Sequence, residues 1–387
     1  MQSANLSERG FSQIDYDLHG IVGIRVCNAT PADAAVVTRQ LGPIKAPLER
    51  DPDIVIHFVD ELPTPTPVRY LGLNDAGFTD DAFLVLRSKH KARARVQIPF
   101  EQIGQGCEIV CERGLPAVPL LIPIINLTAL SKGALPLHAS AFIYNGMGVL
   151  VTGWSKGGKT ETLLAFMANG ATYVGDEWIY LTEDGEHMYG IPEPMRVWEW
   201  HLRELPRYRA SVAMGDRIRL HTLGWVTRAM DWAISSGVGR KSAPIRLMSR
   251  MLPLLRRQLN VQLPPGEMFV DGARSLEGTP DKLFWVASHE TPEIRVESVT
   301  AEEIARRMVF SLQEERIDFT SYYLKFRFAF PEARNPLIED VEELQRRTIL
   351  RALAGKEAYA VFHPYPVSIP ALYDVMSPYL EGPGHVA

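Results

Sequence analysis

Hydrophobic and polar residues alternate in short segments over roughly the first 115 residues of the chain. Such alternation is typical of strands with one buried face. One segment differs, because Pro31 to Leu41 has helical spacing and Thr30 before it is a suitable N-cap. We therefore predict an N-terminal α+β domain, residues 1–133, with no catalytic cluster of its own. Its expected strands span residues 21–26, 54–59, 82–86, 94–98 and 107–111.

The most apolar stretch of the chain runs from Ala117 to Leu130. It contains Pro119, Pro123 and Asn126, and it is shorter than the roughly 20 apolar residues that a transmembrane helix needs. We expect a buried helix that leads into a second domain, residues 134–387. The N-terminal residues lack the basic and then apolar pattern of a signal peptide, so we expect a cytoplasmic protein.

The pattern next predicts a strand, a glycine-rich loop and a helix in immediate succession. The strand spans residues 147–152, and the helix begins at Lys159 and ends at Asn169-Gly170. Between them, residues 153–160 fit the phosphate-binding pattern G-x-x-x-x-G-K-[ST]. This order predicts a nucleoside triphosphate site.

Each residue type in this loop has a chemical reason to be there. Glycines let successive backbone N–H groups face a phosphate, which also meets the positive end of the helix. Lys159 would reach the β- and γ-phosphates of ATP with Lys156 adding positive charge, and the Thr160 hydroxyl would bind Mg²⁺. The expected nucleotide-binding residues are Gly153, Trp154, Ser155, Lys156, Gly157, Gly158, Lys159, Thr160 and Glu161.

Two adjacent acids follow in a segment that reads as one buried strand, Tyr173 to Leu181. A buried carboxylate is costly unless it is paired or bound to a metal, so Asp176 and Glu177 are functional candidates. Neighbours in a strand point to opposite faces, which predicts different tasks for the two acids. Either Glu177 or Glu199 could hold Mg²⁺ together with Thr160, directly or through water.

Four segments together resemble the core of the bacterial HPr kinase/phosphorylases, whose fold is the phosphoenolpyruvate-carboxykinase-like P-loop fold. They are Leu137–Ser140, Gly146–Gly153, Gly158–Thr162 and Val174–Glu177, and the resemblance covers about residues 135 to 200. The spacing between the histidine, the loop and the acids is included. The family's later signature, Glu-Ile-Arg-Gly-x-Gly, is absent, and residues 192–200 stand near its place.

The resemblance implies roles for individual residues. His138 matches the family's active-site histidine, Lys159 its phosphate-binding lysine and Thr160 its Mg²⁺-binding residue. Asp176 matches the first acid of an Asp-Asp pair, which accepts the proton of the substrate serine. Glu177 replaces the second aspartate and keeps its charge. We would expect His138 to orient Asp176 or the acceptor.

Residues 202–263 look like a basic helical insertion, because strand patterning resumes only at Lys282. Between Arg203 and Arg257, twelve Lys and Arg face three acids, a formal charge of +9 in a chain whose net charge is -5. An amphipathic helix with a kink at Pro253 is expected near its end. Such a segment could pack on the chain's own acidic surface, or bind an acidic substrate or partner peptide, nucleic acid or a membrane surface.

After the insertion, Arg274 is a candidate for stabilising charge on the transferred phosphoryl group. Helices are expected from residue 301 to 310 and from 338 to 353, and a last strand from 358 to 363 would close the sheet. His363 then reads as a strand-end histidine. The three cysteines have no metal or redox spacing, so we expect reduced, apolar cysteines.

These features predict an α/β protein, α+β overall, with a P-loop core. The expected function is ATP- and Mg²⁺-dependent transfer of the γ-phosphate to a hydroxyl of a protein, peptide or small molecule. Two alternatives stay open at this point, a nucleotide-binding regulatory module without transfer and a carboxykinase-like enzyme. A homo-oligomer is also possible.

Overall fold

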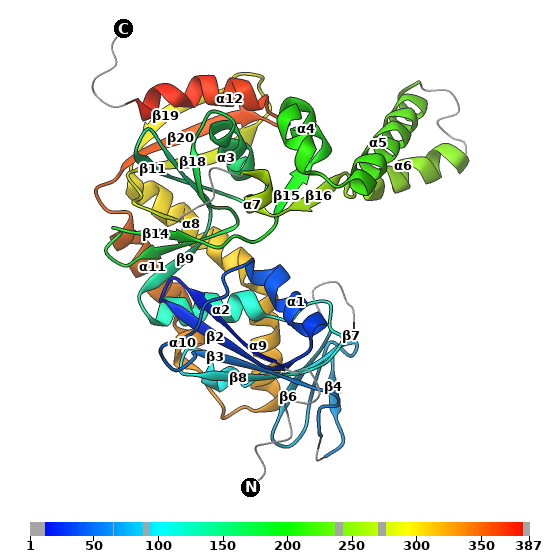
Figure 1. Ribbon diagram of the computed structural model, residues 1–387, viewed down its shortest axis with the longest axis vertical. Helices are drawn as coiled ribbons and strands as arrows, with labels where there is room; N and C mark the ends of the chain where they lie inside the picture. The colour runs from blue at the N-terminus through cyan, green and yellow to red at the C-terminus, as the bar shows by residue number, and fades with distance from the viewer. Residues whose placement is uncertain (1–11, 65, 88–92, 237–242, 270–275, 382–387) are drawn as a thin grey trace.

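The computed structural model describes residues 12–64, 66–87, 93–236, 243–269 and 276–381. The fold is mixed α/β, which confirms the predicted α+β class. Figure 1 shows a lower half that contains the N-terminal sheet and an upper half that contains the other sheets. Two helices, α5 (Met214–Ser235) and α6 (Ala243–Arg256), project sideways from the upper half (Figure 1). Among the described residues, no helix has the length and apolarity needed to cross a membrane.

The N-terminal sheet has eight strands in the order β1-β2-β3-β8-β7-β6-β5-β4. Strands β2, β3 and β8 are parallel to one another, and the remaining neighbours are antiparallel. All five predicted strands are confirmed, whereas β1, β4 and β5 were not predicted. The strands are β1 (Ser12–Leu18), β2 (Val22–Ala29), β3 (Ile54–Val59), β4 (Arg69–Leu71), β5 (Ala76–Phe78), β6 (Phe83–Arg87), β7 (Arg93–Gln97) and β8 (Cys107–Glu112).

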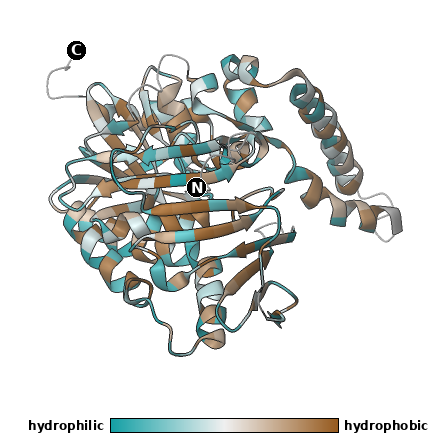
Figure 2. Cartoon of the chain, turned by 60° about the horizontal axis from the view of Figure 1, so that its bottom comes forward, coloured by the Kyte–Doolittle hydropathy of each residue, from teal (hydrophilic) through white to brown (hydrophobic). Residues whose placement is uncertain are grey.

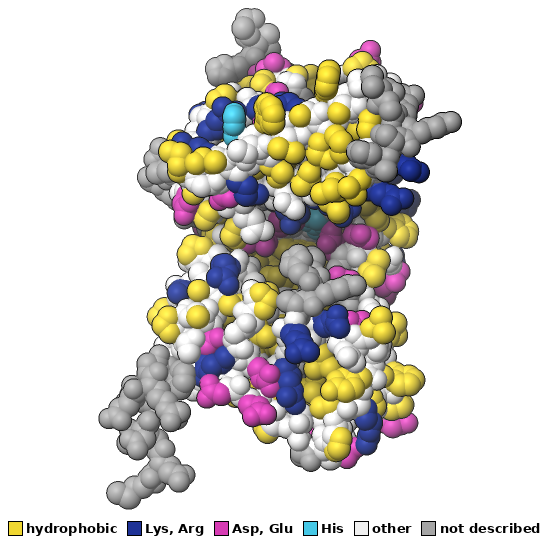
Figure 3. Space-filling model, turned by 90° about the vertical axis from the view of Figure 1, so that its right-hand side faces the viewer, with side chains coloured by type: hydrophobic (Ala, Val, Ile, Leu, Met, Phe, Trp, Pro, Cys, Tyr) yellow, Lys and Arg dark blue, Asp and Glu magenta, His cyan; other side chains and the backbone are white. Residues whose placement is uncertain are grey.

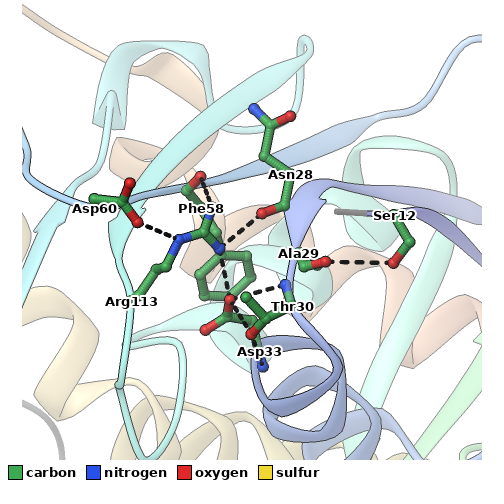
Figure 4. Close-up of polar contacts among 8 residues, drawn as sticks. All are labelled: Ser12, Asn28, Ala29, Thr30, Asp33, Phe58, Asp60 and Arg113. Atoms are coloured by element: carbon green, nitrogen blue, oxygen red, sulfur yellow. Dashed lines mark hydrogen bonds and ion pairs between the residues drawn. The ribbon is translucent and has the colours of Figure 1, made fainter. Parts of the chain in front are cut away.

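The predicted helix α1 (Pro31–Leu41) is confirmed, and Thr30 caps it as expected. A charged network fixes this end of the helix to the sheet. Arg113 Nη1 lies 2.7 Å from Asp33 in the first turn, and its Nε lies 2.8 Å from Asp60 (Figure 4). Burial raises the pKa of Asp33, but hydrogen bonds from Thr30 and Arg113 outweigh it and lower the pKa overall. The charges of Arg113, Asp33 and Asp60 therefore have a structural role, which is to hold α1 against the sheet.

Two further helices cover the N-terminal sheet. The expected buried helix is α2 (Leu121–Ser131), and α9 (Ile317–Ala329) comes from far along the chain to pack on β5 and β6. Phe326 of α9 stacks on Phe100 with ring centroids 5.3 Å apart and meets Phe83 edge-on. Figure 2 shows hydrophobic residues recurring along the strands and the helices packed on them. The division predicted at residue 133 stays a prediction, and the hydrophobic core runs across it.

The upper half contains a six-stranded sheet in the order β12-β10-β11-β18-β20-β19. Strands β11, β18 and β20 are parallel, so their carboxyl ends lie at the same edge. Beside it lies a four-stranded antiparallel sheet, β17-β14-β13-β9. The strands are β9 (Ala134–His138), β10 (Ser140–Tyr144), β11 (Met147–Gly153), β12 (Thr172–Gly175), β13 (Trp178–Thr182), β14 (Met188–Gly190), β17 (Glu277–Gly278), β18 (Lys282–His289), β19 (Arg295–Val299) and β20 (Glu357–Pro364).

Three expectations for this half are wrong in detail. The single strand expected over Tyr173 to Leu181 is two strands in different sheets, because the backbone turns at Glu177, whose φ is +72°. The helix expected from 338 to 353 is divided at Asp340 into α10 (Pro336–Glu339) and α11 (Val341–Ala352). The last strand, β20, lies inside the sheet, because β19 pairs along its outer side.

The remaining helices complete the upper half. Helix α3 follows the glycine-rich loop, α8 is longer than the predicted helix, and α12 packs on α3. Between β15 and β16 the chain leaves the body and returns, because these strands pair with Trp198 opposite Asn260. The elements are α3 (Lys159–Met167), β15 (Met195–Trp198), α4 (Glu199–Glu204), β16 (Asn260–Leu263), α7 (Pro265–Met268), α8 (Ala301–Glu315) and α12 (Ile369–Met376).

Candidate functional site

The glycine-rich loop connects β11 to α3, in the order that the sequence predicted. Three of its residues have positive φ: Gly153 at 155°, Lys156 at 64° and Gly158 at 111°. A Cβ on Gly158 would stand 2.1 Å from Nε2 of His363, so this position requires glycine for space as well as for conformation. The His363 Nε2 also lies 2.9 Å from the carbonyl oxygen of Gly157. His363, expected as a strand-end residue, therefore fixes the loop from β20.

Lys159 is the first residue of α3, and its side chain is folded back over the loop. Its Nζ donates to the carbonyl oxygens of Gly153 at 3.2 Å and Trp154 at 3.1 Å. The residue is 6% exposed, and burial lowers the pKa of Lys159 although Glu177 and Asp176 lie near enough to raise it. A buried cation is thus held above the loop, where an anion would be stabilised.

The next residue, Thr160, joins the loop to the acids. Its Oγ1 donates to Asp176 Oδ2 at 3.0 Å. Asp176 follows β12 and is only 2% exposed. Burial, followed by the negative charge of Glu177, raises the pKa of Asp176 to about 7, while Thr160 and Lys159 act in the opposite direction. The hydroxyl expected to bind Mg²⁺ is thus a direct neighbour of Asp176, the acid expected to accept the proton, and not of Glu177 or Glu199, which were expected to hold the metal.

Glu177 belongs to a second group of side chains, built around His138. The His138 ring comes from the end of β9, and its Nε2 lies 3.0 Å from Glu177 Oε2. Its Nδ1 lies 2.5 Å from Glu315 Oε1, at the end of α8. Burial disfavours protonation of His138, but the two carboxylates outweigh it and raise its pKa, while the hydrogen bond from His138 lowers the pKa of Glu177.

This arrangement differs from one expectation. His138 was expected to orient Asp176 or the acceptor, and the structure places it against Glu177 instead. Asp176 and Glu177 lie between β12 and β13 and Glu177 has a left-handed backbone, so strand alternation does not govern the pair. Glu315 was not predicted, since an acid near the end of an amphipathic helix looks like any surface residue in the sequence.

Glu161, expected among the nucleotide-binding residues, instead forms a buried pair with His201. Its Oε1 lies 3.1 Å from His201 Nε2, and His201 Nδ1 accepts from the backbone N–H of Trp198. That hydrogen bond leaves the ring proton on Nε2, facing the carboxylate. Burial opposes ionisation of Glu161, but the bond from His201 outweighs it and lowers the pKa of Glu161. The pair anchors α4 to the first turn of α3.

The other expected residues are placed as follows. Glu199 pairs with Arg203 and Arg228, and together with residues of α5 it lines a groove of about 350 Å³. Among the described residues its recorded ion pairs are with these two arginines, and it has none with Thr160 or Asp176. Arg274 lies outside the described residues. Trp154 and Lys156 are exposed on the loop, and Ser155 is half-buried.

Thr160 and Asp176 are the two residues that could hold Mg²⁺ together with a bound nucleotide. Within the described ranges there is no group of three or more His, Cys, Asp or Glu residues arranged to hold a metal ion. Mg²⁺ typically takes one or two carboxylates from the protein and further oxygens from substrate phosphates and water. The Thr160 hydroxyl and the Asp176 carboxyl, 3.0 Å apart beside the loop, match that requirement.

A small cavity lies beside the His138 group. Trp178, Glu315 and Arg316 line a cavity of about 20 Å³ next to His138, which has room for a water molecule rather than a substrate. Figure 3 shows the surface hollowed between the upper and lower halves, with acidic and basic side chains around the hollow.

A search against protein-family models found no match for this chain, and a search of curated proteins found none either. The functional conclusion therefore depends on the residues and geometry of the chain itself.

Proposed function

We propose that this protein is an ATP- and Mg²⁺-dependent phosphotransferase, resembling the HPr kinase/phosphorylases, that transfers the γ-phosphate to a hydroxyl group. The observation that carries the proposal is the hydrogen bond between Thr160 and Asp176. Thr160 follows Lys159 of the loop, and Asp176 is a buried acid whose pKa is raised. Asp176 also precedes Glu177, which is hydrogen-bonded to His138. Perturbed acids of this kind are common at catalytic sites.

The loop would bind the phosphates through its own groups. The positive-φ residues of the loop and the N-terminus of α3 would direct backbone N–H groups to the phosphates, and the buried Lys159 would supply a positive charge. When ATP enters, its phosphate oxygens would replace the carbonyl oxygens of Gly153 and Trp154 as acceptors for Lys159. Bound Mg²⁺ would supply charge neutralisation at the phosphates, held by Thr160 and Asp176.

The geometry favours an exchange of the expected roles, which were proton acceptance by Asp176 and metal binding by Glu177 or Glu199. Asp176 is almost fully buried and engaged by Thr160, so an acceptor hydroxyl has little access to it. The Glu177 side chain is 44% exposed and ionised beside His138. We infer that Asp176 serves the metal side and that Glu177 faces the acceptor.

In this scheme Glu177 takes the proton of the acceptor hydroxyl as its oxygen bonds to the γ-phosphorus. The bond from the γ-phosphorus to the oxygen that bridges it to the β-phosphate breaks, and ADP leaves. His138, fixed by Glu315, holds the Glu177 carboxylate in position through the 3.0 Å hydrogen bond. Positioning and charge carry the rate, as is usual in phosphoryl transfer.

The test uses a soluble extract of the source cells with Mg²⁺ and γ-¹⁸O-labelled ATP, followed by mass spectrometry. The protein should label one peptide or metabolite, and Lys159→Ala should not. Calorimetry then distinguishes the role of Glu177 from that of Asp176. Glu177→Gln should bind ATP within about twofold of the parent and transfer phosphate about 100-fold more slowly or worse, whereas Asp176→Asn should lose the Mg²⁺-dependent part of ATP binding. Glu314→Gln, an exposed neighbour of Glu315, is the matched control.

Other outcomes would redirect the assignment. Full turnover by Lys159→Ala would rule out this site. Binding preserved in Asp176→Asn with transfer lost would return the proton-acceptor role to Asp176. Tight ATP binding with no labelled product would favour a regulatory module, and CO₂-linked turnover would favour a carboxykinase.

A further inference from the structure

We propose that Trp200 and Tyr365 hold the base of the bound nucleotide, which stacks on the face of one ring and meets the other, perpendicular ring at its edge. This inference rests on the proposed function, because it places the base of the same nucleotide whose phosphates occupy the loop. The two rings come from α4 and from the turn after β20, and their centroids are 6.1 Å apart at an interplanar angle of 88°.

The sheet places this pair on the correct side of the loop. Gly153 is in register with Val286 of β18, which is in register with Val361 of the parallel strand β20. The loop after β11 and Tyr365 after β20 therefore lie at the same edge. Asp176 follows β12, on the opposite side of β11 in the strand order. Ligands of such sheets bind at the carboxyl ends of the strands. If the phosphates bind at the loop and near Asp176, the base of the nucleotide extends toward the β20 side of the sheet.

Tyr365 lies near the loop because a residue close to it in the chain, His363, contacts the loop directly. His363, two residues earlier, lies 2.9 Å from the Gly157 oxygen and fills the space that a side chain on Gly158 would need. Two residues of chain span at most about 7 Å, so Tyr365 cannot be far from the loop. Its side chain is 50% exposed, which leaves ring surface open to a ligand.

Trp200 is tied to the same place by a second, independent contact. Its neighbour His201 bonds Glu161 in the first turn of α3 at 3.1 Å, and both of those side chains are buried. The half-buried Trp200 ring therefore stands beside the end of α3 that faces the loop. Every nucleobase offers a flat face to an aromatic ring, so a Trp and a Tyr at this place suit a base.

The experiment compares ATP with inorganic tripolyphosphate, which has the phosphates and no base. Calorimetry on the full chain gives both dissociation constants for the parent, Trp200→Ala, Tyr365→Leu and the double variant. Trp232→Ala, an exposed tryptophan on α5 with 75% of its surface accessible, is the control. Tyr365→Phe keeps the ring and tests rescue if the smaller side chains disturb folding. Circular dichroism checks the fold of each variant.

We expect the double variant to bind ATP about tenfold more weakly or worse, as for the loss of one stacked base, and tripolyphosphate within about twofold of the parent. Tyr365→Phe should bind ATP like the parent. Unchanged ATP binding in the double variant would overturn the inference. So would an equal loss for both ligands, or a loss seen only with Trp154→Ala in the loop. If the parent chain binds neither ligand, the proposed function itself fails, and that result is visible before any variant is made.

Discussion

Asp176 and Glu177 are adjacent in the chain, yet they contact different partners. Thr160 engages the first and His138 the second. The division follows from one backbone angle, the positive φ of Glu177, which ends β12 and lets β13 begin in another sheet. Two carboxylates in different environments can take different roles in one reaction.

The buried Asp176 predicts a pH-dependent stability change. Its pKa is raised to about 7 in the folded chain against 3.8 in the unfolded one, so the folded state retains the proton longer. The contribution of Asp176 to stability is therefore greatest below pH 4 and is lost as the pH rises through 7. Asp176→Asn should therefore leave the free energy of unfolding nearly unchanged at pH 4 and raise it by about 1–3 kcal/mol at pH 8.

Urea unfolding of the metal-free protein with a chelator, at both pH values, checks this expectation. The subtraction of the two chains cancels the titration of groups that they share. A variant that is destabilised at pH 8, or equally stabilised at both pH values, would contradict the raised pKa.

Gly158 carries a second prediction at the scale of one residue. Gly158→Ala needs a Cβ within 2.1 Å of His363 Nε2 and a φ of 111°, which an alanine adopts with strain. We expect the loop to shift, tripolyphosphate binding to fall about tenfold or more, and the thermal midpoint to drop. Gly146→Ala, also at positive φ but with open space around it, separates the strain from the clash. Equal binding by both variants would show that contact with His363 does not shape the loop.

At the scale of elements, α5 and α6 are attached to the body by a narrow base. Strands β15 and β16 pair where the segment leaves and returns, and Arg219 of α5 donates to the carbonyl oxygens of Gln258 and Asn260. Helix α5 exposes Ile218, Trp225 and Trp232 at a spacing of seven residues, which puts them along one line of its surface. The partner predicted for this basic region stays a hypothesis.

We predict that the helical pair is dispensable for nucleotide binding. Replacing residues 214–257 by a short Gly-Ser linker should leave ATP affinity within about twofold, because the ends are already paired at β15 and β16. Calorimetry and the labelling assay give two readouts. Retained ATP binding with lost transfer would assign the acceptor or partner to these helices. Lost ATP binding would show that they support the loop.

At the scale of the whole molecule, α9 joins the two halves. It follows α8, whose last residue is Glu315 of the His138 group, and it packs on the N-terminal sheet. Asn335, fully buried after α9, donates to the carbonyl oxygens of Phe100 and Ile103. The N-terminal sheet therefore supports the helices that complete the site, and its strands as the structure describes them contribute no recorded side-chain contact to the loop or the acids.

Phe326→Ala should reveal this support. Phe326 is 3% exposed among Phe83 and Phe100, and its removal should cost about 3–5 kcal/mol of unfolding free energy. Phe328→Ala on the same helix removes a ring that is 73% exposed and should change stability by less than about 0.5 kcal/mol. Denaturant unfolding measures both. Similar losses in the two variants would show that the packing of α9 on the sheet contributes little.

The sequence by itself determined the elements whose pattern is local. Alternation predicted five strands of the N-terminal sheet, helical spacing and the Thr30 cap predicted α1, and glycine spacing predicted the strand, loop and helix around residues 153–160. In each case the signal lies within a few residues, because caps, turns and amphipathic faces are local properties.

Only the tertiary structure decided which distant side chains meet. His138 with Glu177 and Glu315, Glu161 with His201, and His363 with Gly157 join residues up to 206 positions apart. It also divided the acid-bearing strand at Glu177 and placed α9 on the first sheet. These contacts depend on the order of strands in the sheets and on the packing of helices over them. Hydrophobic periodicity along the chain specifies neither.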